Sequence, residues 1–171
     1  MARLERKALA HYLDSTFGNV LSSASWFLIG TYIEDLTVNL NPDTSTIKNV
    51  LGETRVTDNG YEPEVSADPN YADPDDAIYP KISSIAFDRK VGDDCKTLML
   101  EVIVKDTADT NHLAYVEDVI VKPQSYGGPN GGINIPYNVT FNGNRIKGYV
   151  SATSIAAKAP VFTAGAIPSG S

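Results

Sequence analysis

The second half of the chain carries the clearest alternation of apolar and polar residues. From Ile133 to Phe141, five apolar residues alternate strictly with four that are not, and a period of two predicts a strand with one buried face. Asn142-Gly143 then predicts a tight hairpin turn, with a return strand from Ile146 to Val150. Because proline cannot donate to a strand ladder, Pro136 predicts an edge position or a bulge.

Four other segments have strand patterns. Apolar residues alternate with polar ones from Leu113 to Val121 and from Leu36 to Leu40, and two alternating faces are defined from Leu98 to Val104. The short apolar run from Trp26 to Ile33 contains β-branched and aromatic residues, which favour a buried strand over a helix. The chain is therefore predicted to be mainly β.

Between residues 41 and 76 the alternation dissolves, and prolines and an Asn-Gly pair interrupt the segment. We expect a long loop here, with one helical turn near Ile47 to Leu51 and a brief strand from Glu53 to Thr57. More than thirty residues of loop inside a compact domain indicate a function or a contact with a partner.

One helix is expected next to the strands, over residues 74–90. Asp73 is a good N-cap, Pro74 suits the first helical position, and the acids that follow favour the positive end of the helix dipole. Pro80 removes one intrahelical hydrogen bond and predicts a distorted first half. Four apolar residues then fall on one face: Ile78, Ile82, Ile85 and Ala86.

The length of 171 residues fits a single domain. We expect an N-terminal arm over residues 1–25, whose pattern is weak, and a β core over 26–153. Residues 154–171 are rich in alanine, serine, glycine and proline. This composition predicts an extended tail that becomes ordered only on a partner.

The net charge of −7 is concentrated in one segment. Between Glu53 and Asp76, eight acids stand against one base, Arg55, so this segment alone sums to −7 (1 − 8) and the rest of the chain is balanced. A surface that binds DNA tightly needs clustered lysine and arginine. The sequence has no such cluster, so no tight binding of nucleic acid is expected. No apolar run approaches the ~20 residues of a membrane span, and no signal peptide is expected because Glu5 interrupts the basic residues of the start.

The side chains offer little catalytic chemistry. Cys95 is the only cysteine, so it forms no internal disulfide and builds no structural zinc site; we expect an ordinary small side chain near the start of a strand. His11 and His112 are the only histidines, and no GxSxG, phosphate-binding loop or HExxH pattern is present. The sequence therefore predicts a protein that is not an enzyme and needs no cofactor.

For one group of acids, a calcium site is the alternative to helix capping. These residues lack the spacing and the glycine of an EF-hand loop, and capping of the expected helix explains three of them. We therefore expect no metal. The group consists of Asp68, Asp73, Asp75 and Asp76.

Three segments together resemble a known family. They read NPDTSTIKNVLGETRVTDNGYEPEVSADPNYADPDDAIYP at residues 41–80, KPQSYGG at 122–128 and IPYNVTFNGNRIKG at 135–148. This combination resembles the major tail protein, or tail tube protein, of tailed bacteriophages, and most nearly that of phages infecting Gram-positive bacteria. The resemblance spans roughly residues 26–150.

The resemblance implies a β-sandwich or barrel-like core with one flanking helix, a long assembly loop and extended termini. It also implies six-fold rings that stack into a tube, whose lumen conducts DNA without binding it specifically. The implied partners are other copies of the chain, a tape measure protein, a tail terminator and baseplate or initiator proteins, with a sheath protein if the tail contracts. The implied location is the virion tail, after synthesis and assembly in the cytoplasm of the host bacterium.

Two candidate sites follow. The first is an assembly loop that contacts other subunits or rings; the alternative is a solvated acidic loop. The second places three polar residues at the inner wall of the tube; the alternative is an outer sheet with the same alternation. The loop candidates are Glu53, Asp58, Tyr61, Glu62, Glu64, Asp68 and Tyr71, and the lumen candidates are Asn134, Asn138 and Thr140.

Two other functions remain open. A β-sandwich binding module, of a carbohydrate-binding or adhesin type, would share the alternation and the acidity, but it should carry a signal peptide and an exposed aromatic platform. A tail-completion or baseplate protein of the same fold would form one ring and stop. Indefinite polymerisation separates such a protein from a tube subunit.

Overall fold

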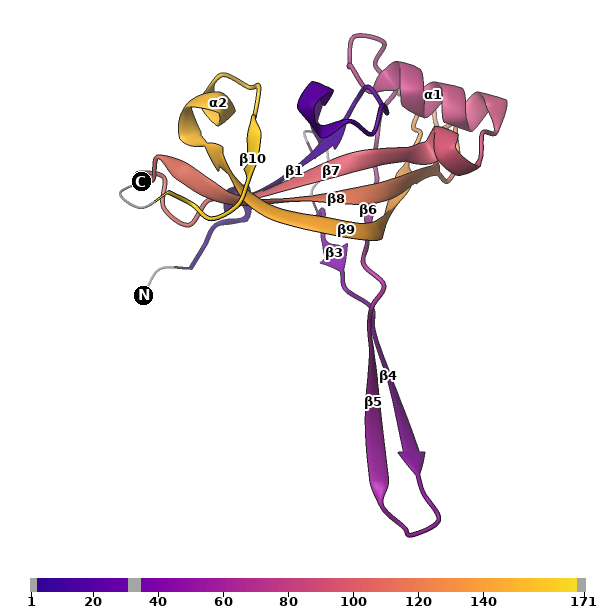
Figure 1. Cartoon of the computed structure of the whole chain (residues 1–171). Coiled ribbons are helices and arrows are strands. Elements are labelled where there is room, and N and C mark those ends of the chain that lie inside the picture. The colour runs from indigo at the N-terminus through magenta and orange to yellow at the C-terminus, as the bar shows by residue number, and fades with distance from the viewer. Residues whose placement is uncertain (1–2, 31–34, 169–171) are drawn as a thin grey trace.

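A computed structural model describes residues 3–30 and 35–168 (Figure 1). Eight strands form one strongly curled, antiparallel sheet in the order β2-β1-β7-β8-β9-β6-β3, and β10 pairs with a second stretch of β9. The strands of this sheet are β1 (Leu9–Asp14), β2 (Trp26–Leu28), β3 (Val38–Asn39), β6 (Glu64–Ala67), β7 (Lys96–Ile103), β8 (Asn111–Pro123), β9 (Tyr137–Ser151) and β10 (Phe162–Ala164).

The remaining elements lie around this sheet. A separate two-stranded hairpin, β4 (Pro42–Lys48) and β5 (Thr54–Tyr61), projects from one end of the molecule, and α1 (Tyr79–Asp88) and α2 (Ala152–Ala156) lie at the other end (Figure 1). Three short 3-10 helices complete the described part: η1 (Arg6–Ala8), η2 (Leu21–Ser23) and η3 (Gly92–Cys95).

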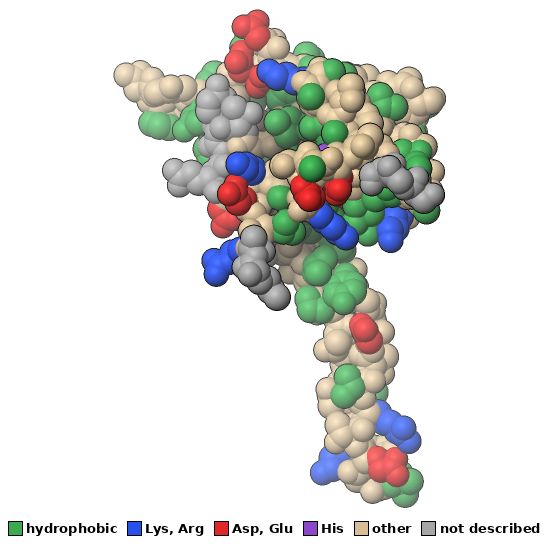
Figure 2. All heavy atoms as spheres, turned by 90° about the vertical axis from the view of Figure 1, so that its left-hand side faces the viewer, with side chains coloured by type: hydrophobic (Ala, Val, Ile, Leu, Met, Phe, Trp, Pro, Cys, Tyr) green, Lys and Arg blue, Asp and Glu red, His purple; other side chains and the backbone are tan. Residues whose placement is uncertain are grey.

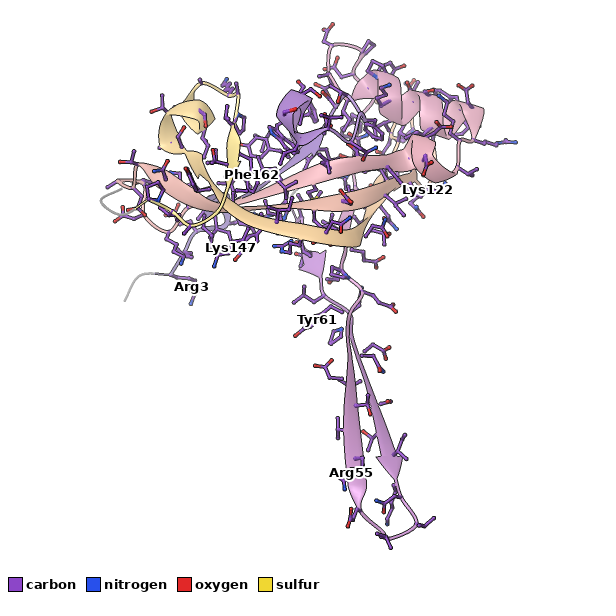
Figure 3. All side chains as sticks on the ribbon, viewed as in Figure 1. Arg3, Arg55, Tyr61, Lys122, Lys147 and Phe162 are labelled. Carbon is purple, nitrogen blue, oxygen red and sulfur yellow. The ribbon has the colours of Figure 1, made fainter. Side chains whose placement is uncertain are left out.

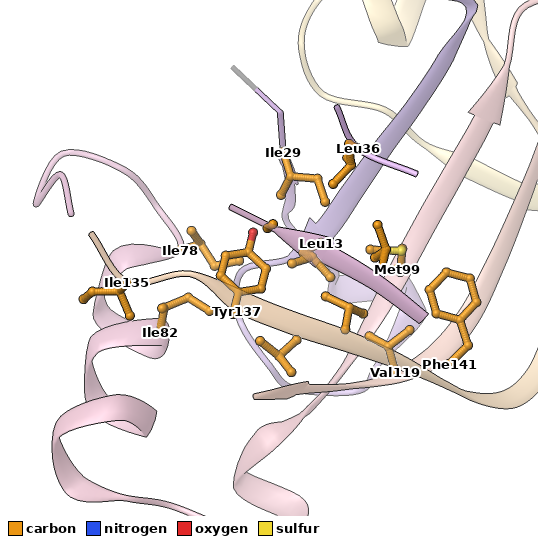
Figure 4. Close-up of a cluster of buried hydrophobic side chains, with 14 residues drawn as sticks. Leu13, Ile29, Leu36, Ile78, Ile82, Met99, Val119, Ile135, Tyr137 and Phe141 are labelled. Atoms are coloured by element: carbon orange, nitrogen blue, oxygen red, sulfur yellow. The ribbon is translucent and has the colours of Figure 1, made fainter. Parts of the chain in front are cut away.

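Alternation along the strands builds two apolar clusters on opposite faces of the sheet. In β7, Met99 belongs to one cluster, while Leu98 and Leu100 belong to the other. The first cluster lies under α1, whose Ile82 points toward Tyr137 of β9 (Figure 4). The second cluster is covered by α2 through Ile155 and by β10 through Phe162. The predicted mainly β fold with one main flanking helix is confirmed.

The predicted hairpin turn at Asn142-Gly143 is wrong, because β9 runs unbroken through it. The register between β8 and β9 shifts on both sides of Asp118, and Gly143 and Asn144 have φ angles of 98° and 56°. Residues that tolerate positive φ serve a β-bulge as well as a turn, so the same sequence signal produced a bulge.

The edge position predicted from Pro136 is also wrong. Pro136 precedes β9, which lies inside the sheet between β8 and β6. The proline carbonyl accepts a hydrogen bond from the N–H of Gln124 at 2.7 Å. A proline just ahead of a strand removes no ladder donor, so the strand needs no edge there.

Both chain ends differ from the expectation. The weak pattern of the N-terminal arm hides β1, which lies inside the sheet between β2 and β7. The expected unstructured tail folds back as α2 and β10 on the edge of β9. Within the described residues 26–30 of the apolar run, the strand β2 covers three residues at the sheet edge, and residues 31–33 of the run lie outside the described residues.

The helix begins later than predicted, at Tyr79 instead of residue 74. The Oδ1 atom of Asp73 accepts the N–H of Asp75 at 2.9 Å and forms a turn ahead of the helix. Pro80 therefore occupies the first helical turn, where its missing N–H has no partner to lose, and no distortion is needed. The predicted apolar face is confirmed, since Ile82 and Ile85 are 2% and 4% exposed.

The prediction of a long loop over residues 41–76 is wrong, because this segment contains three strands, β4, β5 and β6. Ile47 lies in β4 rather than in a helical turn, whereas β5 agrees with the brief strand predicted from Glu53 to Thr57. Both faces of β4 are exposed. Alternation of apolar residues reports burial of one face, so a strand pair exposed on both sides leaves no such signal.

Candidate functional site

The hairpin formed by β4 and β5 projects away from the body of the molecule (Figures 1 and 3). Its pairing runs from Pro42 opposite Tyr61 to Lys48 opposite Thr54, with an irregularity next to Thr44. At about 3.4 Å per residue, the strands reach roughly 25 Å. Asn49 shapes the turn, because its Oδ1 atom accepts the N–H groups of Leu51 and Glu53 at 2.9 and 3.0 Å.

The hairpin exposes apolar side chains along its length. Figure 2 shows them as separate patches on the projection. Two-stranded hairpins on their own are marginally stable at best in water, and these side chains gain no burial from the chain's own core. Their exposed fractions are 60% for Ile47, 102% for Val50, 77% for Leu51, 68% for Val56 and 62% for Tyr61.

The root of the hairpin is held firmly on the sheet. The N–H of Glu62 donates to the carbonyl of Leu40 at 3.0 Å, and Asn41 Nδ2 donates to the carbonyl of Glu62 at 3.0 Å. The Pro63 carbonyl accepts the N–H of Phe141 in β9 at 3.0 Å. These hydrogen bonds connect the projecting hairpin to the ends of β3 and β6 and to β9 of the main sheet.

Beside the root lies a hollow of about 610 Å³ with a charged floor. Nη1 of Arg145 lies 2.8 Å from Glu101 Oε1 and 3.0 Å from Glu117 Oε1, and the guanidinium stacks 4.2 Å above the centre of the Tyr115 ring. The bulge in β9 at Gly143 and Asn144 places Arg145 at the floor of this hollow. Within the bulge, the N–H of Gly143 donates to the Oε2 atom of Glu117 at 3.2 Å.

Glu101 and His11 form the buried part of this ionic cluster. His11 is 1% exposed, and its Nε2 atom lies 3.4 Å from Oε2 of Glu101, a contact that falls short of a hydrogen bond. Burial alone would raise the pKa of Glu101, but the facing His11 and Arg145 side chains outweigh it and hold this pKa below its usual value. Glu101 therefore stays charged, and the cluster fixes the sheet beneath the hairpin root. Sequence reasoning missed it because Glu101, Glu117 and Arg145 are distant in sequence.

The seven predicted assembly residues do not form one loop. Glu53 and Asp58 lie on the hairpin, Tyr61 and Glu62 at its root, and Glu64 in β6. Their role in assembly stays a prediction. The other two lie past β6 on the body: Tyr71 forms a β-bridge with Asn134, and Asp68 accepts from Asn134 Nδ2 at 3.4 Å.

The three predicted lumen residues also separate. Asn138 and Thr140 share the face of β9 that points away from the first cluster, beside Ser66 and Glu64 of β6. Asn134 instead holds a loop, because its Oδ1 atom accepts the N–H of Asn70 at 2.8 Å. Whether this face lines a lumen stays a prediction.

The remaining candidate side chains have structural positions. Cys95 is buried just before β7, as predicted, and its Sγ donates to the carbonyl of Lys90 at 3.3 Å. Partial burial and the neighbouring Asp73 and Asp75 raise the pKa of Asp76. Among residues 3–30 and 35–168, no three His, Cys, Asp or Glu side chains are grouped to hold a metal ion. None of the helices in this described part is long and apolar enough to cross a membrane.

Comparison with known proteins establishes the fold. No protein-family model matches the chain, and no curated protein matches its sequence. A chain from the tail of an empty GTA particle, determined by helical refinement with C6 symmetry, shares the fold with a TM-score of 0.56 and 15% sequence identity. The match covers 84% of this chain and 97% of that chain. The narrower resemblance to phages of Gram-positive bacteria stays a prediction.

Proposed function

We propose that this chain is a structural subunit of a phage tail tube. In this proposal, copies of the chain form hexameric rings, the rings stack, and the lumen conducts DNA during ejection. The fold shared with a chain of a C6-symmetric particle tail supports it. The protein is then a structural component of the virion tail, assembled in the host cytoplasm, and its main partner is itself.

The observation that carries the proposal is the hairpin. Its strands project roughly 25 Å and expose apolar side chains that are at least 60% accessible. A partner surface that buries these side chains would stabilise a conformation that is marginal alone. The hairpin lies at one end of the molecule, away from α1 and α2 (Figure 1). A contact between the hairpin and the opposite end of another copy would join unlike surfaces, and such a contact builds an open stack when its rotation does not close a ring.

The polar face of β9 is the proposed lumen wall. Asn138 and Thr140 are neighbours of Ser66 and Glu64 in the ladder, and the chain as a whole carries a charge of −7. A wall of neutral and negative groups does not retain phosphates. DNA would therefore pass through the tube without specific binding.

The test is negative-stain electron microscopy of the purified chain at rising concentration, beside a hairpin deletion. In the deletion, residues 41–61 are replaced by Asn-Gly, which closes a two-residue turn between Leu40 and Glu62. Leu40 and Glu62 are already hydrogen-bonded neighbours, so the sheet should remain intact. Circular dichroism and thermal unfolding check that the deleted chain is folded.

We expect stacked rings or hollow tubes with six-fold end views from the intact chain, and a folded protein without stacking from the deletion. Normal tubes from the deletion would refute the role of the hairpin. Single rings that never stack from the intact chain would favour a tail-completion or baseplate protein. An intact chain that stays monomeric at every concentration would contradict the proposal.

A further inference from the structure

Three asparagine–glycine pairs occur in the chain, at Asn59-Gly60, Asn130-Gly131 and Asn142-Gly143. This dipeptide is chemically labile, because glycine has no side chain to hinder attack of its backbone nitrogen on the preceding asparagine side chain. The attack needs an asparagine that can rotate and a glycine N–H that is free to lose its proton. The three pairs look equivalent in the sequence, whereas the fold gives them different surroundings.

Two of the pairs lie in strands, and in each of them a carboxylate holds the glycine N–H. In β5, the N–H of Gly60 donates to Oδ1 of Asp58 at 2.9 Å. In the bulge of β9, the N–H of Gly143 donates to Oε2 of Glu117 at 3.2 Å. A negative charge at hydrogen-bond distance opposes loss of the proton, and a strand resists rotation of the asparagine. Both pairs are therefore protected.

The third pair has neither form of protection. Asn130 and Gly131 lie in the segment between β8 and β9, and both residues are exposed. A Cβ atom on Gly131 would meet nothing within 4 Å. In the part of the chain that the structure describes, neither the N–H of Gly131 nor the side-chain amide of Asn130 has a hydrogen-bond partner. The glycine nitrogen is therefore open to deprotonation.

The loop that carries this pair is fixed at its base and open at its tip. The N–H of Asn134 donates to the carbonyl of Gly127 at 2.7 Å, and the N–H of Gly127 donates to the carbonyl of Asn134 at 3.2 Å. Exposed loops open locally at little cost in free energy, whereas strand residues need part of the global unfolding free energy. Asn130 can therefore reach the conformation for attack while the flanking strands stay in place.

We propose that Asn130 is a site of spontaneous deamidation in this protein, and that Asn59 and Asn142 are spared. The backbone nitrogen of Gly131 gives its proton to solvent and attacks Cγ of Asn130. A bond forms between this nitrogen and Cγ, the bond from Cγ to Nδ2 breaks, and Nδ2 takes up a proton and leaves as ammonia. Water then hydrolyses the cyclic imide at either carbonyl, which yields aspartate or isoaspartate.

Each conversion changes the surface of the protein. The new carboxylate takes the net charge from −7 to −8 (−7 − 1), and isoaspartate also adds one backbone carbon to a loop whose base is fixed. The base of the loop is joined to the segment before α1, because Asn134 forms a β-bridge with Tyr71. The protein should therefore acquire more acidic forms with time. This inference does not depend on the proposed function.

The test is storage of the purified chain in mildly alkaline buffer, followed by proteolysis and quantification of each Asn-Gly peptide by mass spectrometry. Enzymatic methylation with a protein isoaspartyl methyltransferase counts isoaspartate separately. The matched variant is Gly131→Ala, whose methyl group hinders the attack but meets no neighbour in the fold. The converse variant is Asp58→Ala, which removes the acceptor of the Gly60 N–H.

Deamidation at Asn130 should be at least about tenfold faster than at Asn59 or Asn142, because local opening of a strand adds to the barrier there. Gly131→Ala should slow the reaction at Asn130 without a change in thermal unfolding, and Asp58→Ala should accelerate the reaction at Asn59. In urea that unfolds the chain, the three rates should converge.

Equal rates at the three pairs in the folded protein would overturn the proposal, as would a faster reaction at Asn59 or Asn142 than at Asn130. A preference for Asn130 that persists unchanged in urea would show that the local sequence, and not the fold, selects the site. An unchanged rate at Asn59 in the Asp58→Ala chain would overturn the protective role of the carboxylate.

Discussion

Gly148 provides the sharpest test of how the C-terminal segment is held. Strand β10 crosses β9 so closely at this position that a Cβ atom would overlap the carbonyl oxygen of Thr163. The same Cβ would lie 2.6 and 2.8 Å from the Cζ and Cε2 atoms of the Phe162 ring. Backbone cannot move out of the way as a flexible side chain can, so Gly148→Ala should displace β10 from the edge of β9.

The cost can be worked out from what β10 loses. Phe162 is partly buried against the second cluster. Full burial of such a ring stabilises a protein by about 1.5–3 kcal/mol, so displacement of the partly buried ring should cost about half of that amount. Each ladder hydrogen bond lost between β10 and β9 adds about 1 kcal/mol. Gly148→Ala should therefore lower the free energy of unfolding by about 2–4 kcal/mol.

The assay is urea-induced unfolding followed by circular dichroism, with limited proteolysis of the native protein to detect release of the C-terminal segment. Gly131→Ala is the matched control, because a Cβ there meets nothing within 4 Å. Phe162→Ala should cost little in the Gly148→Ala background, since the ring is already displaced. A Gly148→Ala protein within about 0.5 kcal/mol of the parent, with unchanged proteolysis, would refute the reasoning.

Three further changes test the sheet and its ionic cluster. Leu100→Ala, at a fully buried position of the second cluster, should lower the unfolding free energy by about 2–5 kcal/mol; a loss below about 1 kcal/mol in urea unfolding would contradict the assigned packing. Arg145→Met leaves Glu101 and Glu117 without their shared cation. Because solvent screens the partly exposed Arg145, the free energy of unfolding should fall by an amount in the lower part of the range of about 1.5–3 kcal/mol. An unchanged free energy of unfolding would show that the ion pairs contribute nothing. Glu101 has a lowered pKa in the folded state, so its stabilisation is present above the unfolded-state pKa of about 4.3 and is lost as pH falls through the folded value. The difference in unfolding free energy between the parent and Glu101→Gln should therefore be constant near neutral pH and shrink below about pH 4; a difference that does not change with pH would contradict the assignment.

The sequence by itself determined the elements that pack against the chain's own core. Strands β7 and β8 and the buried face of β9 follow from alternation, because a period of two matches the pleat of a strand, and the isoleucines of α1 follow from helical spacing. The unusual character of residues 41–76 was also visible, since a long segment without a core-facing pattern indicates contact outside the chain.

Only the tertiary structure decided what the ambiguous signals became. Asn142-Gly143 suits a turn or a bulge, and the continuous partner strand β8 selected the bulge. The weak pattern of the N-terminal arm became β1 because β7 and β2 supply partners on both sides.

Only a brief strand within β5 of the hairpin was predicted, and the hollow of about 750 Å³ between β2, α2 and the segment before α1 was invisible in the sequence. The hairpin buries no face in its own chain, so no periodicity marks it. The hollow unites residues from β2, from the segment after β6 and from α2, which are more than a hundred positions apart at the extremes. Sequence patterns report how each segment meets its own core, whereas surfaces built from distant segments exist only once the chain has folded.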